Sequence, residues 1–132
     1  PRSTPLYSSA ASDVYKRQVS GRSVLLDIKV LTPRWTDFQN TPGALRTQWR
    51  IYRANLLRHE EGHVKIALRA ARAVDKYLGV CGASSSLDKL KRDIQKNTTT
   101  LLKQYRKIDQ GYDLRTRHGA AQGVSLKRRP AD

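Results

Sequence analysis

Two of the three histidines in this chain lie four residues apart around a glutamate. His59 and His63 enclose Glu60 in the stretch HEEGH (59–63). In a helix, positions i and i+4 lie one turn apart on the same face, so two imidazoles at this spacing can direct nitrogen atoms at one point. Zn²⁺ accepts such nitrogens and makes a bound water more acidic. The stretch therefore predicts a zinc site at His59 and His63, with a metal-activated water and Glu60 as general base.

A catalytic zinc site also needs a third protein ligand and an open coordination position. The chain has one cysteine, so no cysteine pair can hold the metal and its ligands must be His, Asp or Glu. The one further histidine, His118, lies in YDLRTRHG (112–119) and is the first candidate. Asp113 is the nearest alternative, followed by Asp75 and Asp109. The sequence leaves this choice open.

The stretch around His118 also offers supporting groups. With His118 as a ligand, Asp113 or Thr116 is expected to orient a ligand through a hydrogen bond. Tyr112 is expected to donate a hydrogen bond to the oxyanion of the transition state. The alternative is a pair of histidines that merely pack in the core. The carboxylate between them, at this spacing on one helix face, favours the metal site.

Periodicity predicts the elements that position these residues. Over 42–78, apolar residues and both histidines of HEEGH recur at steps of three and four, which indicates a long helix. A second helix is predicted over 87–109, ended by Gly111, and the remainder over 111–126 is predicted as a glycine-rich loop with a short strand at its end. The period-two pattern of SVLLDIKVL (23–31) predicts a half-buried strand. The expected fold class is α+β, with two long antiparallel helices packed on a small, truncated β-sheet.

At this point the motifs resemble those of a known family. HEEGHVKIALRAARAV (59–74), the upstream PRW (33–35) with Trp49, and YDLRTRHGAAQG (112–123) are similar to the motifs of a family of predicted secreted bacterial zinc-dependent proteases. The similarity covers most of 24–123. Its pattern pairs HExxH with a later Y-D-x-x-T-x-H-G motif, and both motifs occur here without a gap.

This resemblance carries expectations about fold, activity and location. It implies a zincin-like metallopeptidase that is periplasmic or secreted. It also implies His59, His63 and His118 as zinc ligands and Glu60 as the catalytic base. The expected partner is a peptide or protein substrate, and the oligomeric state is left undetermined.

The first eighteen residues, PRSTPLYSSAASDVYKRQ (1–18), differ in character from the rest of the chain. They resemble, in frame, the translation of a sequencing adaptor, and are therefore expected to be foreign to the natural protein. A single metallopeptidase domain is expected over 19–123, truncated at its N-terminus, followed by a basic tail over 124–132. An adaptor junction near Val19 would also account for the missing export signal.

The net charge and composition bear on three other classes of function: nucleic-acid binding, membrane insertion and non-catalytic metal binding. The net charge of +15 suggests a polyanion partner, but the basic residues are spread along the chain and no nucleic-acid-binding motif accompanies them. We therefore expect no specific nucleic-acid binding. No apolar run is long enough to span a membrane. The main alternative to peptide hydrolysis is a non-catalytic zinc-binding or interaction module of the bacterial envelope.

Overall fold

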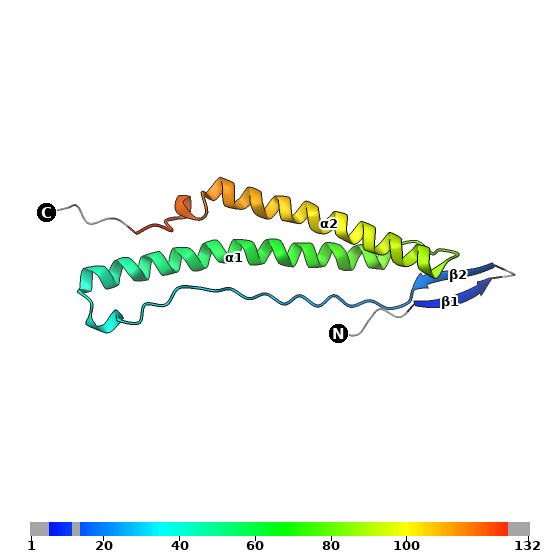
Figure 1. The fold of residues 1–132 in the computed structure, drawn as a ribbon, viewed down its shortest axis with the longest axis horizontal. Helices are drawn as coiled ribbons and strands as arrows, with labels where there is room; N and C mark the ends of the chain where they lie inside the picture. Colours follow the sequence, from blue (N-terminus) through cyan, green and yellow to red (C-terminus); the bar gives the residue numbers. More distant parts are fainter. Residues whose placement is uncertain (1–5, 12–13, 127–132) are drawn as a thin grey trace. The chain divides into compact units, whose positions relative to one another are not determined.

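The computed structural model describes residues 6–11 and 14–126 of the chain. Two long helices and a β-hairpin are its main elements (Figure 1). The chain divides into two compact units, and each unit contains a segment of both long helices. Unit 1 comprises Pro1–Asp27 and Ile66–Lys107, and unit 2 comprises Ile28–Lys65 and Ile108–Asp132.

The two predicted helices are confirmed as α1 (Gly43–Val80) and α2 (Leu87–Thr116). In the turn between them, Ser86 caps the start of α2, because its hydroxyl accepts a hydrogen bond from the backbone N–H of Lys89 at 3.3 Å. Asp88 in the first turn of α2 adds a negative charge where the helix dipole favours one.

The helices run antiparallel within each unit. In unit 1, Arg69 of α1 lies over the ring of Tyr105 of α2, and Tyr77, further along α1, bonds to Asn97, earlier on α2. In unit 2, His59 contacts Asp113, and His63, one turn later, contacts Asp109, one turn earlier. The antiparallel pairing expected from the sequence is therefore seen in both units.

The predicted end of α2 is wrong, because the helix continues through Gly111 to Thr116. A glycine inside a helix costs about 1 kcal/mol relative to alanine. The contacts that α2 makes with α1 on either side of Gly111 outweigh this cost. The helix ends where Arg117, His118 and Gly119 adopt left-handed backbone angles, with φ of 51°, 53° and 92°.

The predicted strand over 23–31 is also wrong, since residues 20–35 contain neither helix nor strand. A strand needs a neighbour to accept its ladder hydrogen bonds, and among the described residues no strand forms a β-ladder with this segment. Its side chains stay exposed, from 37% for Ile28 to 94% for Leu31.

The β-structure of the described residues lies instead in the N-terminal segment. There β1 (Leu6–Ala11) and β2 (Val14–Val19) form an antiparallel hairpin, with Leu6 opposite Val19. An isolated bridge joins Arg17 to Ser84. The predicted sheet beneath the helices is thus not present among the described residues, and the chain is α-rich.

Buried side chains are few, and the two units bury different kinds. In unit 1, Ile66 and Leu90 are the buried apolar residues among those described, at 8% and 3% exposure. In unit 2, the buried side chain is polar, because His59 is 3% exposed. No described helix is long and apolar enough to cross a membrane.

Candidate metal site

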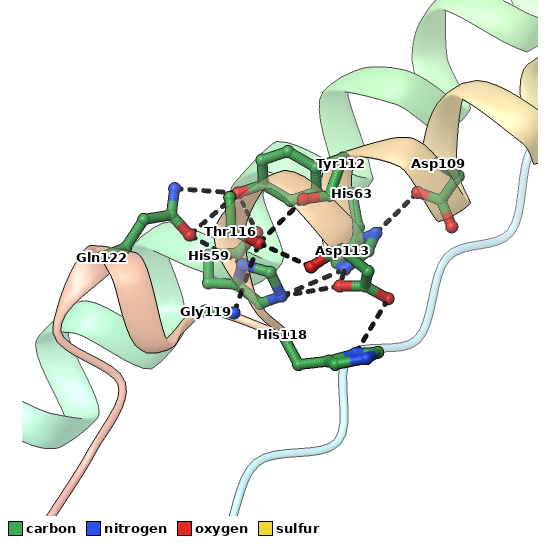
Figure 2. Close-up of polar contacts among 9 residues, drawn as sticks. All are labelled: His59, His63, Asp109, Tyr112, Asp113, Thr116, His118, Gly119 and Gln122. Atoms are coloured by element: carbon green, nitrogen blue, oxygen red, sulfur yellow. Dashed lines mark hydrogen bonds and ion pairs between the residues drawn. The ribbon is translucent and has the colours of Figure 1, made fainter.

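In unit 2, segments of α1 and α2 bring three potential metal ligands together. His59 and His63 project from α1, and Asp113 projects from α2 toward both of them (Figure 2). One ligand atom from each of the three lies within 4.8 Å of the others. The i, i+4 spacing of the histidines therefore does what the sequence predicted, and α2 supplies the opposing carboxylate.

The three ligand atoms form a small triangle. Asp113 Oδ1 lies 3.1 Å from Nε2 of His59 and 2.9 Å from Nε2 of His63. The two Nε2 atoms are 3.2 Å apart. Tetrahedral bonds of about 2.0–2.1 Å to zinc would place neighbouring ligand atoms about 3.3 Å apart. The donor set and its spacing therefore fit a small tetrahedral cation such as Zn²⁺.

The other nitrogen of each imidazole is held by an acceptor oxygen. Nδ1 of His63 lies 2.6 Å from Asp109 Oδ1, and Nδ1 of His59 lies 2.7 Å from Gln122 Oε1. An oxygen acceptor at Nδ1 favours the tautomer with the proton there, which leaves Nε2 with a free lone pair. Histidine ligands to metals are commonly oriented in this way.

Three lone-pair atoms that face one another within 3.2 Å need a positive charge between them. That charge is either a metal ion or a proton shared with Asp113. Burial disfavours a charged His63, but hydrogen bonds and charge attraction from Asp109 and Asp113 outweigh it and raise the pKa of His63 above its usual 6.5. The same electronegative arrangement that attracts a proton also attracts a cation.

Tyr112 shapes the site by packing rather than by facing the ligand atoms. Its ring stacks on His59, with centroids 5.0 Å apart, and meets His63 edge-on at 4.9 Å. Its hydroxyl donates to the backbone carbonyl of His59 at 2.9 Å and accepts from the side-chain amide of Gln122 at 3.1 Å. The Tyr112 hydroxyl, which was expected to donate to an oxyanion, is therefore hydrogen-bonded to His59 and Gln122 in this structure.

Gly62 makes this packing of Tyr112 possible. A Cβ atom at position 62 would overlap the phenol ring, with the ring carbon Cε1 only 2.8 Å away. This close approach is the physical reason for a glycine inside the HEEGH turn of α1.

His118 is not part of the triangle. Its side chain is 79% exposed, and Nδ1 lies 3.6 Å from Oδ2 of Asp113, the oxygen that does not meet the other histidines. Thr116 serves the turn before it: its hydroxyl donates to the carbonyl of Tyr112 at 2.8 Å and accepts from the N–H of Gly119 at 3.3 Å. The structure therefore brings together His59, His63 and Asp113, with His118 beside the carboxylate.

Glu60 lies next to His59 on α1 and is half-buried. Among the described residues it has no hydrogen-bond or ion-pair partner, whereas the oxygens of Asp113 and Asp109 lie against histidine nitrogens. Glu60 therefore remains available to a water or a substrate.

Two residues of this site, Asp113 and Gln122, differ in how far the sequence pointed to them: Asp113 was the second candidate ligand, and Gln122 was not a candidate. Asp109 and Asp113 are themselves an i, i+4 pair, which mirrors His59 and His63 on the opposing helix. That signal was readable only if the helix continued past Gly111. Gln122 had no such signal, because it reaches His59 from the short 3₁₀ helix η2 (Ala120–Gln122) beyond the left-handed turn.

The fold and the site define a helical chain with a His-His-Asp cluster able to hold a metal ion. A family described as "Bacterial protein of unknown function (DUF922)" matches residues 8–119. The chain therefore belongs to this bacterial family. No curated protein and no solved structure matches it. The family match begins within segment 1–18, and the adaptor origin of that segment stays a prediction.

Proposed function

We propose that the chain is a zinc-dependent peptidase. The observation that carries this proposal is the geometry around HEEGH: two Nε2 atoms and a carboxylate oxygen converge while acceptor oxygens hold both Nδ1 atoms. A site that only stabilised the fold would have no use for the further carboxylate of Glu60 beside it.

In this proposal His59, His63 and Asp113 hold the metal. Zn²⁺, when bound, supplies a Lewis acid that polarises a peptide carbonyl and lowers the pKa of water. Glu60 accepts a proton from the attacking water and delivers it to the leaving nitrogen as the C–N bond breaks. His118 then orients Asp113 through its second oxygen rather than binding the metal itself, and this exchange of roles differs from our first expectation.

Other parts of the proposal rest on the family resemblance. They are the zincin-like fold, the periplasmic or secreted location, and a peptide or protein as substrate. The competing function is a non-catalytic zinc-binding or interaction module, which would use the same three ligands. What separates the two is whether Glu60 does chemistry.

The test compares the wild-type chain with Glu60→Gln, a variant that keeps the size and polarity of the side chain. Both are loaded with zinc, checked for metal content, and incubated with a peptide library whose cleavage is followed by mass spectrometry. We expect both proteins to bind zinc and only the wild type to cleave peptides. If both bind zinc and neither cleaves, the peptidase proposal is wrong and the non-catalytic module remains.

A further inference from the structure

A groove runs along unit 1 between its segments of α1 and α2. Its volume is about 770 Å³, and apolar grooves between helices are a recurring docking site for an amphipathic helix of another protein. The residues that line it come from 69–80 of α1 and 97–105 of α2, so the groove belongs to this unit alone. No role in the proposed metal site involves it.

The floor of the groove is apolar. Its half-buried members are Ala73, Tyr77, Leu101 and Tyr105. The hydroxyl of Tyr77 accepts a hydrogen bond from the Asn97 amide at 2.9 Å, so this polar group is already satisfied within the chain. The floor therefore offers surface that gains free energy when an apolar side chain covers it.

One rim of the groove is cationic. Arg69, Arg72 and Lys76 line it from one stripe of α1, at helical steps of three and four, and all three are exposed. Arg69 lies over the ring of Tyr105, with the guanidinium 5.8 Å from the centroid. No acidic residue lines the groove, and the ion pairs of the described chain include neither Arg72 nor Lys76.

We propose that this groove docks an acidic amphipathic helix of a partner protein. A furrow between two antiparallel helices accepts a third helix along its length. From Arg69 to Val80 the rise of α1 is about 16 Å, which matches roughly three turns of such a helix. Its apolar side would cover Tyr77 and Leu101, and its carboxylates would face Arg69, Arg72 and Lys76.

The charge of the chain decides against a second copy as the occupant. A second copy of the chain would also carry a net charge of +15. Its basic side chains would face the basic rim of the groove, and like charges in contact are destabilising. A nucleic-acid strand needs cations along its phosphates, but the α2 wall offers the neutral Asn97 and Thr100.

The experiment measures binding of labelled synthetic peptides of about 14 residues by fluorescence anisotropy. One peptide is an amphipathic helix with leucines on one face and glutamates beside it, and its partner peptide has glutamine at each glutamate. The proteins are the wild type, Arg72→Glu with Lys76→Glu, and a matched control, Lys103→Glu with Lys107→Glu. The control changes the net charge equally, at exposed α2 positions that do not line the groove.

We expect the wild type and the control to bind the glutamate peptide and the groove variant to bind it at least about tenfold more weakly. The glutamine peptide should bind more weakly than the glutamate peptide. Ala73→Phe, which fills the floor without changing charge, should also abolish binding, and it keeps the proposal testable if the charge variant does not fold.

Three results would overturn the proposal. The first is an equal loss of binding in the groove variant and the control, which would indicate general charge attraction. The second is no binding of the glutamate peptide by a folded wild type. The third is binding of anionic phospholipid vesicles or single-stranded DNA that depends on Arg72 and Lys76 while the peptide does not bind.

Discussion

The two units use the same pair of helices for different purposes. In unit 1 the buried side chains are the apolar Ile66 and Leu90, whereas in unit 2 the buried side chain is His59. Each imidazole of this cluster is held at Nδ1 by an acceptor oxygen, from Gln122 for His59 and from Asp109 for His63. Unit 1 thus has apolar side chains in its interior, whereas the interior of unit 2 contains part of the His-His-Asp cluster that could hold a metal ion.

The largest expected effect comes from removing a ligand in unit 2. His63→Ala deletes one corner of the triangle and leaves Asp109 without its partner, so stoichiometric zinc binding should be lost. The loss should exceed the roughly 10–100-fold in affinity that a supporting residue contributes. Metal analysis after dialysis, together with a zinc titration, measures it. Zinc retained at one equivalent would show that the metal lies elsewhere.

Leu90→Ala tests the other side of the comparison. Leu90 is 3% exposed in unit 1, so its truncation should lower the free energy of unfolding by about 2–5 kcal/mol. Urea unfolding of the metal-free proteins measures the change. The folded variant should keep the zinc affinity of the wild type, because Leu90 lies in unit 1 and the three residues of the cluster lie in unit 2. A parallel fall in zinc affinity would mean that the two units are not separable in this way.

Gly62→Ala tests whether the packing of Tyr112 against α1 positions the two histidines. Alanine is the better helix former by about 1 kcal/mol, so propensity alone predicts a gain in stability. A Cβ at this position would overlap the ring of Tyr112, and we therefore expect a loss of about 1–3 kcal/mol and weaker zinc binding. Unfolding and zinc titration of the variant measure both. Higher stability with unchanged zinc affinity would contradict the close contact.

The pH dependence of the metal-free chain gives the smallest expected effect. The folded-state pKa of His63 is raised above 6.5, so its stabilising contribution is full below that pH and is lost as the pH rises through the raised pKa. Asp109→Asn removes the charge that raises it most. Unfolding of chelator-treated protein on both sides of pH 6.5 should show stability falling less steeply with rising pH in the variant than in the wild type. If stability fell equally steeply with pH in both proteins, Asp109 would not be the residue that raises the pKa of His63.

Much of the fold and half of the site were predictable from the sequence. The apolar periodicity predicted both ends of α1 and the start of α2 to within two residues, and the spacing of HEEGH placed two histidines on one face. The end of α2 was not predictable from propensity, because Gly111 is held in the helix by contacts that Asp109 and Asp113 make across to α1. Asp113 was placed behind His118 as a candidate ligand because His118 was the one histidine left without a role.

The strand predicted over 23–31 failed for a related reason. Its alternating apolar residues describe a surface suited to pairing, but pairing depends on a second segment, and none of the described residues supplies one. The contact of Gln122 with His59 could not be predicted, because the position of Gln122 depends on the left-handed turn at Arg117–Gly119. Both cases turn on contacts between segments distant in the sequence.

The most direct test of the central claim compares Asp113→Ala with His118→Ala. Both proteins are loaded with zinc, dialysed and analysed for bound metal. If the triangle holds the metal, Asp113→Ala loses stoichiometric zinc, while His118→Ala keeps one equivalent with an affinity at most about 10–100-fold weaker. Loss of zinc in His118→Ala with full retention in Asp113→Ala would contradict the site described by the structure.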